Sequence, residues 1–308
     1  MVPNEPVRHH YIPQFLLRNF SCDQGRHLHY FSKIDGKDQI REIRETFMER
    51  NLYRDNINYP ELPTQIEHDL ARYEHEVSTL LCTHFMDGRA INITLEEHER
   101  LILFFAVMGF RSLGTEKQFA ETMSRTGKKF YRRYQYNRDY IDLWKRNLGY
   151  IVNCRSMAEI AAHPDIDEPF KLFFFRDTVG ITGKYLVVAE RKGLVSFVIG
   201  DTYPVLISGE LPNGLELPVY SICPISPDRV ILIVNNGADG EPDSVLNFRK
   251  IVLDPPILCG DSQTLKIVVK RLEDSEVNYF NSLLIKEASC GFAHRSEEIP
   301  QLPDICEV

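Results

Sequence analysis

The spacing of apolar residues changes abruptly near Pro169, and this change constrains the fold more than any other feature of the chain. Between residues 64 and 163 apolar residues recur with a period of about 3.6, which is typical of amphipathic helices. After Pro169, short runs of Val, Ile, Phe and Tyr stand between Gly, Pro and Asp, which is typical of strands and turns. Helices and strands that occupy separate parts of the chain predict an α+β fold rather than an alternating α/β fold.

We expect one large α+β domain over residues 1–308, because a chain of this length can bury a substantial core. An N-terminal arm and β-hairpin occupy residues 1–60, a helical subdomain occupies 64–163, and a sheet-rich subdomain with a terminal helix occupies 170–295. The central helical segment is expected to pack against a mostly antiparallel or mixed sheet. The C-terminal half and the N-terminal hairpin are expected to form that sheet together.

Local signals place the individual elements. The pairs Thr64–Glu67 and Thr94–Glu97 have the spacing of a capping box, so they predict the starts of two helices. The other predicted helices cover residues 14–20, 116–137, 139–148, 156–162 and 275–286. The predicted strands cover residues 27–32, 39–44, 172–175, 184–190, 195–199, 205–207, 215–222, 230–234, 244–252 and 265–269.

Composition excludes several classes of protein. The hydrophobic share of 43% and the charged share of 26% are those of a globular chain. The longest uncharged apolar run, Leu101 to Phe110, has ten residues, about half the roughly 20 that span a bilayer. Residues 1–10 contain no apolar signal-peptide core, so a cytoplasmic protein with no membrane association is expected. The seven cysteines are widely spaced without a Cys-x-x-Cys pair, which argues against a zinc finger or a disulfide framework.

Charge is distributed unevenly along the chain. The formal net charge is −8, yet residues 111–155 contain eleven Lys and Arg against four acidic residues. Within this part, residues 128–138 interleave cations with aromatic residues, a composition that suits phosphates and unpaired bases. The same residues also fit an amphipathic helix with Phe130 and Tyr134 on the buried side.

The N-terminal segment resembles a known family. It reads His9-His10-Tyr11-Ile12-Pro13-Gln14-Phe15-Leu16-Leu17-Arg18-Asn19-Phe20-Ser21. This is similar to the opening of the prokaryotic domain of unknown function 4238, whose members start with a His-Tyr-Val-Pro-x-Phe-x-Leu-Arg-x-Phe type signature. Later marks of the resemblance, which covers nearly the whole chain, are Ile66-Glu67, Glu74, Arg111, Gly200-Asp201, the Pro224 to Pro227 turn, Asn278 and Asn281. The family usually shows Ser-Asp-Asn-Pro where this chain has Gly200-Asp201-Thr202-Tyr203-Pro204, and the resemblance implies no settled activity.

Two groups of residues could carry chemistry. His9 and His10 could present an imidazole to a phosphate or a metal, or they could tie the arm to the fold through buried hydrogen bonds. Glu67 and Glu74 lie on nearly the same face of one helix, where Arg111 of the next helix could pair with them. Such a group is either a structural ion pair or a phosphate-binding arginine with a carboxylate that acts as a base or metal ligand.

Asp201 directly follows a predicted strand, where loops often present functional groups, although an ordinary turn aspartate is the alternative. Standard catalytic motifs, including the P-loop and the nucleophile elbow, do not occur in the sequence. The sequence identifies no cofactor and no metal ligands.

The leading hypothesis is an uncharacterised intracellular enzyme that hydrolyses phosphodiesters in nucleic acids or nucleotides, such as a nuclease-like defence or toxin-type effector. The alternatives are a non-catalytic sensor or binding protein for a phosphorylated ligand or a protein partner, and a structural or inhibitory protein. The candidate catalytic residues are His9, His10, Glu67 and Asp201. The candidate substrate-binding residues, for single-stranded nucleic acid or a nucleotide, are Gln14, Arg18, Arg111, Lys128, Lys129, Arg132 and Arg133.

Overall fold

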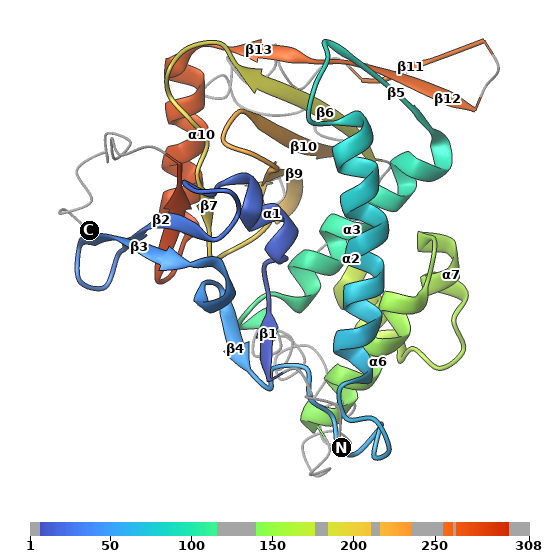
Figure 1. The fold of residues 1–308 in the computed structure, drawn as a ribbon. Helices are drawn as coiled ribbons and strands as arrows, with labels where there is room; N and C mark the ends of the chain where they lie inside the picture. Colours follow the sequence, from blue (N-terminus) through green and yellow to red (C-terminus); the bar gives the residue numbers. More distant parts are fainter. Residues whose placement is uncertain are drawn as a thin grey trace. The chain divides into compact units, whose positions relative to one another are not determined.

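The computed structural model describes residues 7–115, 140–175, 184–210, 216–235, 255–260 and 263–295. Figure 1 shows the helices and strands of the chain, which divides into two compact units. The first unit comprises Met1–Tyr11, Met48–Val77 and Glu99–Ile181, and the second comprises Ile12–Phe47, Ser78–His98 and Thr182–Val308. Two long helices, α2 (Gln65–His84) and α3 (Leu95–Arg111), contribute residues to both units.

The first unit is mainly helical. Its short strands β1 (Arg8–His10) and β4 (Met48–Arg50) pair antiparallel. Its further helices are α6 (Tyr140–Asn153), α7 (Met157–Ala162) and α8 (Glu168–Phe173). An aromatic cluster forms part of its core, where the Phe110 and Trp144 rings stack with centroids 4.2 Å apart.

Residues 172–175, expected as a strand, are helical instead: α8 contains the first two, and Phe174 continues the helical backbone. Pro169 lies in the first turn of α8, where proline is favoured because no intrahelical N–H bond is lost. Phe170, Phe173 and Phe174 then have helical spacing and are buried. The Phe173 and Phe174 rings contact the ring of Phe110. These aromatic residues therefore pack in the core of the helical first unit.

The second unit contains the larger sheets. A five-stranded sheet has the order β13 (Lys270–Leu272), β6 (Lys184–Arg191), β10 (Arg229–Asn235), β9 (Glu216–Pro224) and β8 (Val205–Glu210). Neighbours are antiparallel except for the parallel pair β13 and β6. Helix α10 (Asp274–Glu287) shares a buried cluster with this sheet, in which Val277, Phe280 and Leu284 join Val187 and Leu232.

The N-terminal hairpin pairs with a C-terminal strand in a separate sheet. The order of this four-stranded sheet is β3 (Lys37–Glu42), β2 (His27–Ser32), β14 (Gly291–His294) and β7 (Ile199–Gly200). A third sheet contains β11 (Ile257–Leu258), β12 (Thr264–Val268) and β5 (Ala90–Thr94). Helix α1 (Gln14–Asn19) precedes the hairpin, and the 3-10 helix η1 (Ile43–Glu45) follows it. The predicted α+β class is confirmed, with the strands distributed over several mostly antiparallel sheets.

Local hydrogen bonds explain where sequence patterns succeeded and failed. The capping box of α3 is present: Thr94 N donates to Glu97 Oε2 (2.8 Å), and Glu97 N donates to Thr94 Oγ1 (3.1 Å). The box expected at Thr64 is wrong, because Thr64 Oγ1 has no hydrogen-bond partner among the described residues. Of the strand expected over 195–199, only Ile199 belongs to β7. Side chains of α10 bond part of this stretch instead, since Val195 N and Val198 N donate to Asp274 and Asn281.

Several predictions lie outside the described residues. These are the helix over 116–137 with its basic and aromatic run, and the strand over 244–252. In the described parts of the chain, no helix is both long and apolar enough to span a lipid bilayer.

Candidate functional site: an arginine pocket

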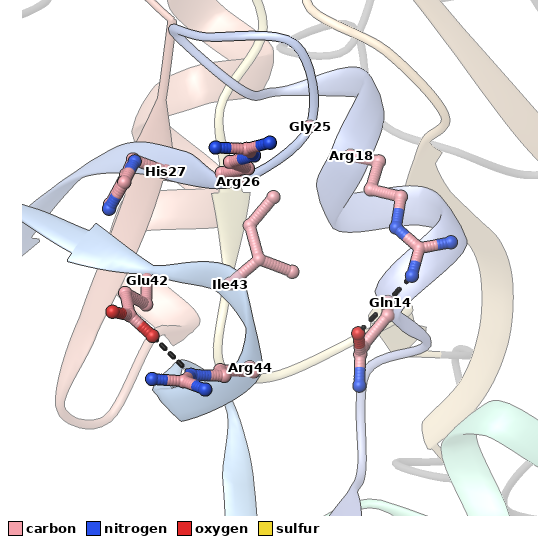
Figure 2. Close-up of a pocket in the computed structure, with 8 residues that line it drawn as sticks. All are labelled: Gln14, Arg18, Gly25, Arg26, His27, Glu42, Ile43 and Arg44. Atoms are coloured by element: carbon pink, nitrogen blue, oxygen red, sulfur yellow. Dashed lines mark hydrogen bonds and ion pairs between the residues drawn. The ribbon is translucent and has the colours of Figure 1, made fainter.

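A pocket of about 430 Å³ lies in the second unit between α1 and the ends of the β2–β3 hairpin. We call it the arginine pocket. Figure 2 shows that its lining comes from three segments, namely α1, the turn before β2 with the first residue of β2, and the end of β3 with η1. The lining residues are Gln14, Arg18, Gly25, Arg26, His27, Glu42, Ile43 and Arg44.

Helix α1 contributes two polar side chains from one face. Gln14 and Arg18 are four residues apart, so they lie one turn apart on the same side of the helix. Arg18 Nη2 donates to Gln14 Oε1 at 3.4 Å. Leu16 and Leu17 on the other side are fully buried and hold α1 on the fold. The amphipathic pattern of α1 thus directs its polar edge toward the pocket.

A tight turn before β2 brings the hairpin close to α1. Gln24 and Gly25 both have positive φ, 27° and 86°, which favours glycine at the second position. Gly25 N donates to Ser21 Oγ at 2.9 Å and fixes the turn. A Cβ at position 25 would lie 3.5 Å from Cγ of Arg18, an ordinary contact, so the positive φ and not a lack of space favours glycine here.

His27 lies at the start of β2 and is held by Asp23. The Asp23 carboxylate accepts a hydrogen bond from His27 N at 2.6 Å, and its other oxygen lies 2.6 Å from His27 Nδ1. The hydrogen bond with the His27 ring lowers the pKa of Asp23. The carboxylate therefore remains ionised and fixes the orientation of the imidazole ring.

The lining of the pocket has an excess of positive charge. Three arginines and one glutamate line it, and that glutamate, Glu42, pairs with Arg44 Nε. The Arg26 guanidinium has no hydrogen bond or ion pair with any part of the chain that the structure describes. Arg18, Arg26 and Arg44 are all exposed. Their planar guanidinium groups suit the two oxygens of a phosphate or carboxylate.

A second polar group, in the first unit, surrounds Arg111. Its side chain is completely buried, with Nη1 2.7 Å from Glu74 Oε1, so the expected pairing across α2 and α3 is present. Arg111 Nη2 donates to the carbonyl oxygen of His10 at 3.1 Å. Tyr53 OH donates to the Arg111 carbonyl oxygen, and Tyr53 N donates to His9 Nδ1 at 2.8 Å. These bonds connect strand β1 with α3.

Burial shifts the acidity of this group. It raises the pKa of Glu67 to about 7, because the charge on Arg111 only partly offsets the loss of water and Glu74 adds repulsion. It also raises the pKa of Glu74, although its ion pair with Arg111 opposes the shift. Because Arg111 has no exposed side-chain surface, a ligand could not reach its guanidinium without displacing the fold.

The residues that the sequence nominated belong to different units. His9, His10, Glu67 and Arg111 belong to the first unit, whereas Gln14 and Arg18 line the arginine pocket in the second. Asp201 also belongs to the second unit, and its carboxylate accepts hydrogen bonds from the backbone N–H groups of Ser289 (2.7 Å) and Cys290 (2.6 Å). Lys128, Lys129, Arg132 and Arg133 lie outside the described residues.

Sequence reasoning missed Arg26, His27 and Arg44. The spacing of Asp23 and His27 across a turn was the available signal, because a carboxylate four residues from a histidine can bond its ring. Across the described segments, no group of three His, Cys, Asp or Glu side chains is arranged to hold a metal ion.

The fold and the pocket together define an α+β protein with an arginine-rich hollow beside an N-terminal hairpin. Residues 8–297 match the family described as Protein of unknown function (DUF4238), and the chain belongs to this family. The resemblance of the N-terminal segment to that family is thereby confirmed. No curated protein and no solved structure matches the chain.

Proposed function

We propose that the protein binds the phosphate group of a nucleotide or of a single-stranded nucleic acid in the arginine pocket. The observation that carries this proposal is the presence of three exposed arginines around one hollow with a single lining carboxylate. Arginine binds phosphate through two parallel hydrogen bonds. Gln14, beside Arg18, adds a neutral donor and acceptor that can contact a sugar or a base.

The size and charge of the pocket fit this ligand class. Its volume of about 430 Å³ falls in the range of small-molecule sites, roughly 300–1,000 Å³. The net charge of −8 repels a polyanion at long range, but salt limits this repulsion to about 8 Å under physiological conditions. Binding is therefore local, and it weakens as salt competes for the arginines.

Phosphodiester hydrolysis is the finer hypothesis that the sequence suggests. The nominated catalytic groups make contacts that serve the fold: His9 Nδ1 accepts from Tyr53 N, and the Asp201 carboxylate accepts from two backbone amides. Any hydrolytic step is accordingly proposed at the arginine pocket, where a phosphate can reach the lining side chains.

The test is a calorimetric titration with AMP, with adenosine as the unphosphorylated control ligand. The double variant Arg18→Gln/Arg26→Gln should weaken AMP binding by about tenfold or more, equivalent to about 1.4 kcal/mol. Arg89→Gln is the matched control, because Arg89 is an exposed arginine of the same unit away from the pocket lining. Equal affinity of parent and double variant, or equal binding of adenosine and AMP, would contradict the proposal.

The basic segment predicted from the sequence has its own test. Replacing Lys128, Lys129, Arg132 and Arg133 with Ser should weaken salt-dependent binding of single-stranded RNA or DNA if this segment guides phosphates. A variant that binds as well as the parent would exclude the segment and leave the arginine pocket as the proposed phosphate site.

A further inference from the structure

We propose that His27, oriented by Asp23, is the catalytic base of the arginine pocket, and that its substrate is single-stranded RNA. This inference rests on the proposed binding of phosphate in the pocket. It assigns a chemical step to two residues, His27 and Asp23, that the sequence did not nominate.

The geometry is that of a base held by a carboxylate. Asp23 Oδ2 lies 2.6 Å from His27 Nδ1, while Asp23 Oδ1 accepts hydrogen bonds from the backbone N–H groups of His27 (2.6 Å) and Arg26 (3.3 Å). The backbone of the turn thus holds the Asp23 carboxylate in place, and the carboxylate fixes the orientation of the His27 ring. Nδ1 carries the proton toward Asp23, which leaves Nε2 as the basic nitrogen. Nε2 has no partner in the ranges that the structure describes.

The pocket places positive charge beside this base. Arg26 directly precedes His27, and Arg18 and Arg44 line the same hollow (Figure 2). Attack on a phosphodiester builds additional negative charge on the phosphate oxygens. Arginines that already hold the phosphate stabilise this charge without rearranging at the moment of reaction.

RNA is the substrate that these groups suit, because its 2′-hydroxyl supplies a nucleophile next to the phosphate. His27 Nε2 takes the proton of the 2′-hydroxyl as O2′ forms a bond to phosphorus and the P–O5′ bond breaks. A solvent water protonates the departing O5′, and the His27 imidazolium returns its proton to solvent. The products are a 2′,3′-cyclic phosphate and a 5′-hydroxyl end, with no net change in oxidation state.

Several charged and polar groups lie near His27. Asp23 bonds the ring, Arg26 is its chain neighbour, and Glu42 lies opposite His27 in the hairpin register. Arg44 pairs with Glu42 and lines the same pocket, and Cys22 Sγ contacts the His27 carbonyl oxygen.

The experiment compares a short single-stranded RNA with the same sequence made of 2′-deoxynucleotides. The parent protein should bind both and cleave only the RNA, with 2′,3′-cyclic phosphate ends detected by mass spectrometry. His27→Ala and His27→Gln should each lower the cleavage rate by about 100-fold or more, with binding of the deoxy oligonucleotide kept within about twofold. His68→Ala is the matched control, because His68 is an exposed histidine on α2.

Asp23 is a positioning residue, so its variant needs a readout beyond the rate. Asp23→Asn should lower kcat for RNA cleavage, because the ring loses its fixed orientation, while KM stays within about twofold. Asp35→Asn, at an exposed position between β2 and β3, should change neither.

The outcomes separate the two proposals. Binding of the deoxy oligonucleotide without cleavage of RNA, or cleavage that His27→Ala leaves unchanged, overturns the catalytic role and leaves phosphate binding intact. If the parent protein does not bind the deoxy oligonucleotide, the proposed phosphate binding and the catalytic role are both overturned.

Discussion

Glu67→Gln should stabilise the protein at neutral and alkaline pH and leave it nearly unchanged in mild acid. Glu67 lies on α2 near Arg111 and Glu74, where burial raises the pKa of its carboxyl from 4.5 to about 7. Between these two values the folded protein keeps a proton on Glu67, whereas the unfolded chain has released it. The folded state thus binds more protons, so stability falls as pH rises through this window.

The magnitude follows from the size of the shift. The difference between 4.5 and about 7, at about 1.4 kcal/mol per pKa unit, corresponds to on the order of 3 kcal/mol. Glutamine has nearly the same shape and does not titrate. The difference in unfolding free energy between the variant and the parent should therefore grow from about zero below pH 4.5 to this full value above pH 7.

Urea unfolding at about pH 5 and about pH 8, followed by tryptophan fluorescence, measures this difference. The chain contains one tryptophan, Trp144, which stacks on Phe110 in the same unit as Glu67. Glu61→Gln is the matched control at an exposed position. If the unfolding free energies of Glu67→Gln and the parent differ by the same amount at both pH values, the assignment of a raised pKa to Glu67 is refuted.

Three further predictions concern the fold. Arg111→Met should destabilise the protein by about 3–5 kcal/mol, because Glu74 is left without its buried partner, and adding Glu74→Leu should recover much of the loss in urea unfolding; equal stability of the single and double variants would contradict the pairing. Asp201→Ala should cost about 2–3 kcal/mol in thermal unfolding, because two backbone amides lose their acceptor, and an unchanged melting temperature would argue against this role. Deleting residues 1–21 removes the buried Leu16, Leu17 and Phe20, each contributing about 1.5–3 kcal/mol, so aggregation is expected in size-exclusion chromatography; a stable monomeric truncation would disprove it.

Local interactions explain which parts of the fold the sequence predicts. The capping box of Thr94 and Glu97 is complete within four residues, so its pattern is sufficient to locate the start of α3. The pair Thr64 and Glu67 has the same spacing, but Glu67 lies in the electrostatic environment of Arg111 and Glu74. A pattern of two residues therefore cannot show whether their reciprocal hydrogen bonds form.

Tertiary packing explains the wrong strand over residues 172–175. A run of aromatic residues is compatible with a strand or with a buried helix, since both bury large side chains. Here the contact partners select the helix. The rings of Phe110 and Trp144, more than 25 positions earlier in the chain, both contact the ring of Phe173. Pro169 was the local sign of a helix start, because proline is tolerated in the first turn.

Some residues of the candidate sites could be predicted from the sequence and others could not. Helix periodicity was enough to pair Arg111 with Glu74, because each lies on a regular element. Gln14 and Arg18 were candidates because they lie in the polar N-terminal segment that resembles the family. Arg44 could not be foreseen, because the β2–β3 register alone brings the end of β3 back beside the start of β2, where residue 27 faces residue 42.

The two groups of arginines differ in what they contribute to the molecule. Arg111 is buried, its charge is paired with the Glu74 carboxylate, and its Nη2 donates to the His10 carbonyl oxygen, so the fold accounts for its charge. Arg18 and Arg26 lie exposed around a hollow, and neither forms an ion pair with any described residue. Exposed charges contribute little to folding, typically less than about 1 kcal/mol. Stability therefore does not explain why they lie with Arg44 around one pocket, and this is the reason that we propose an anionic ligand for it.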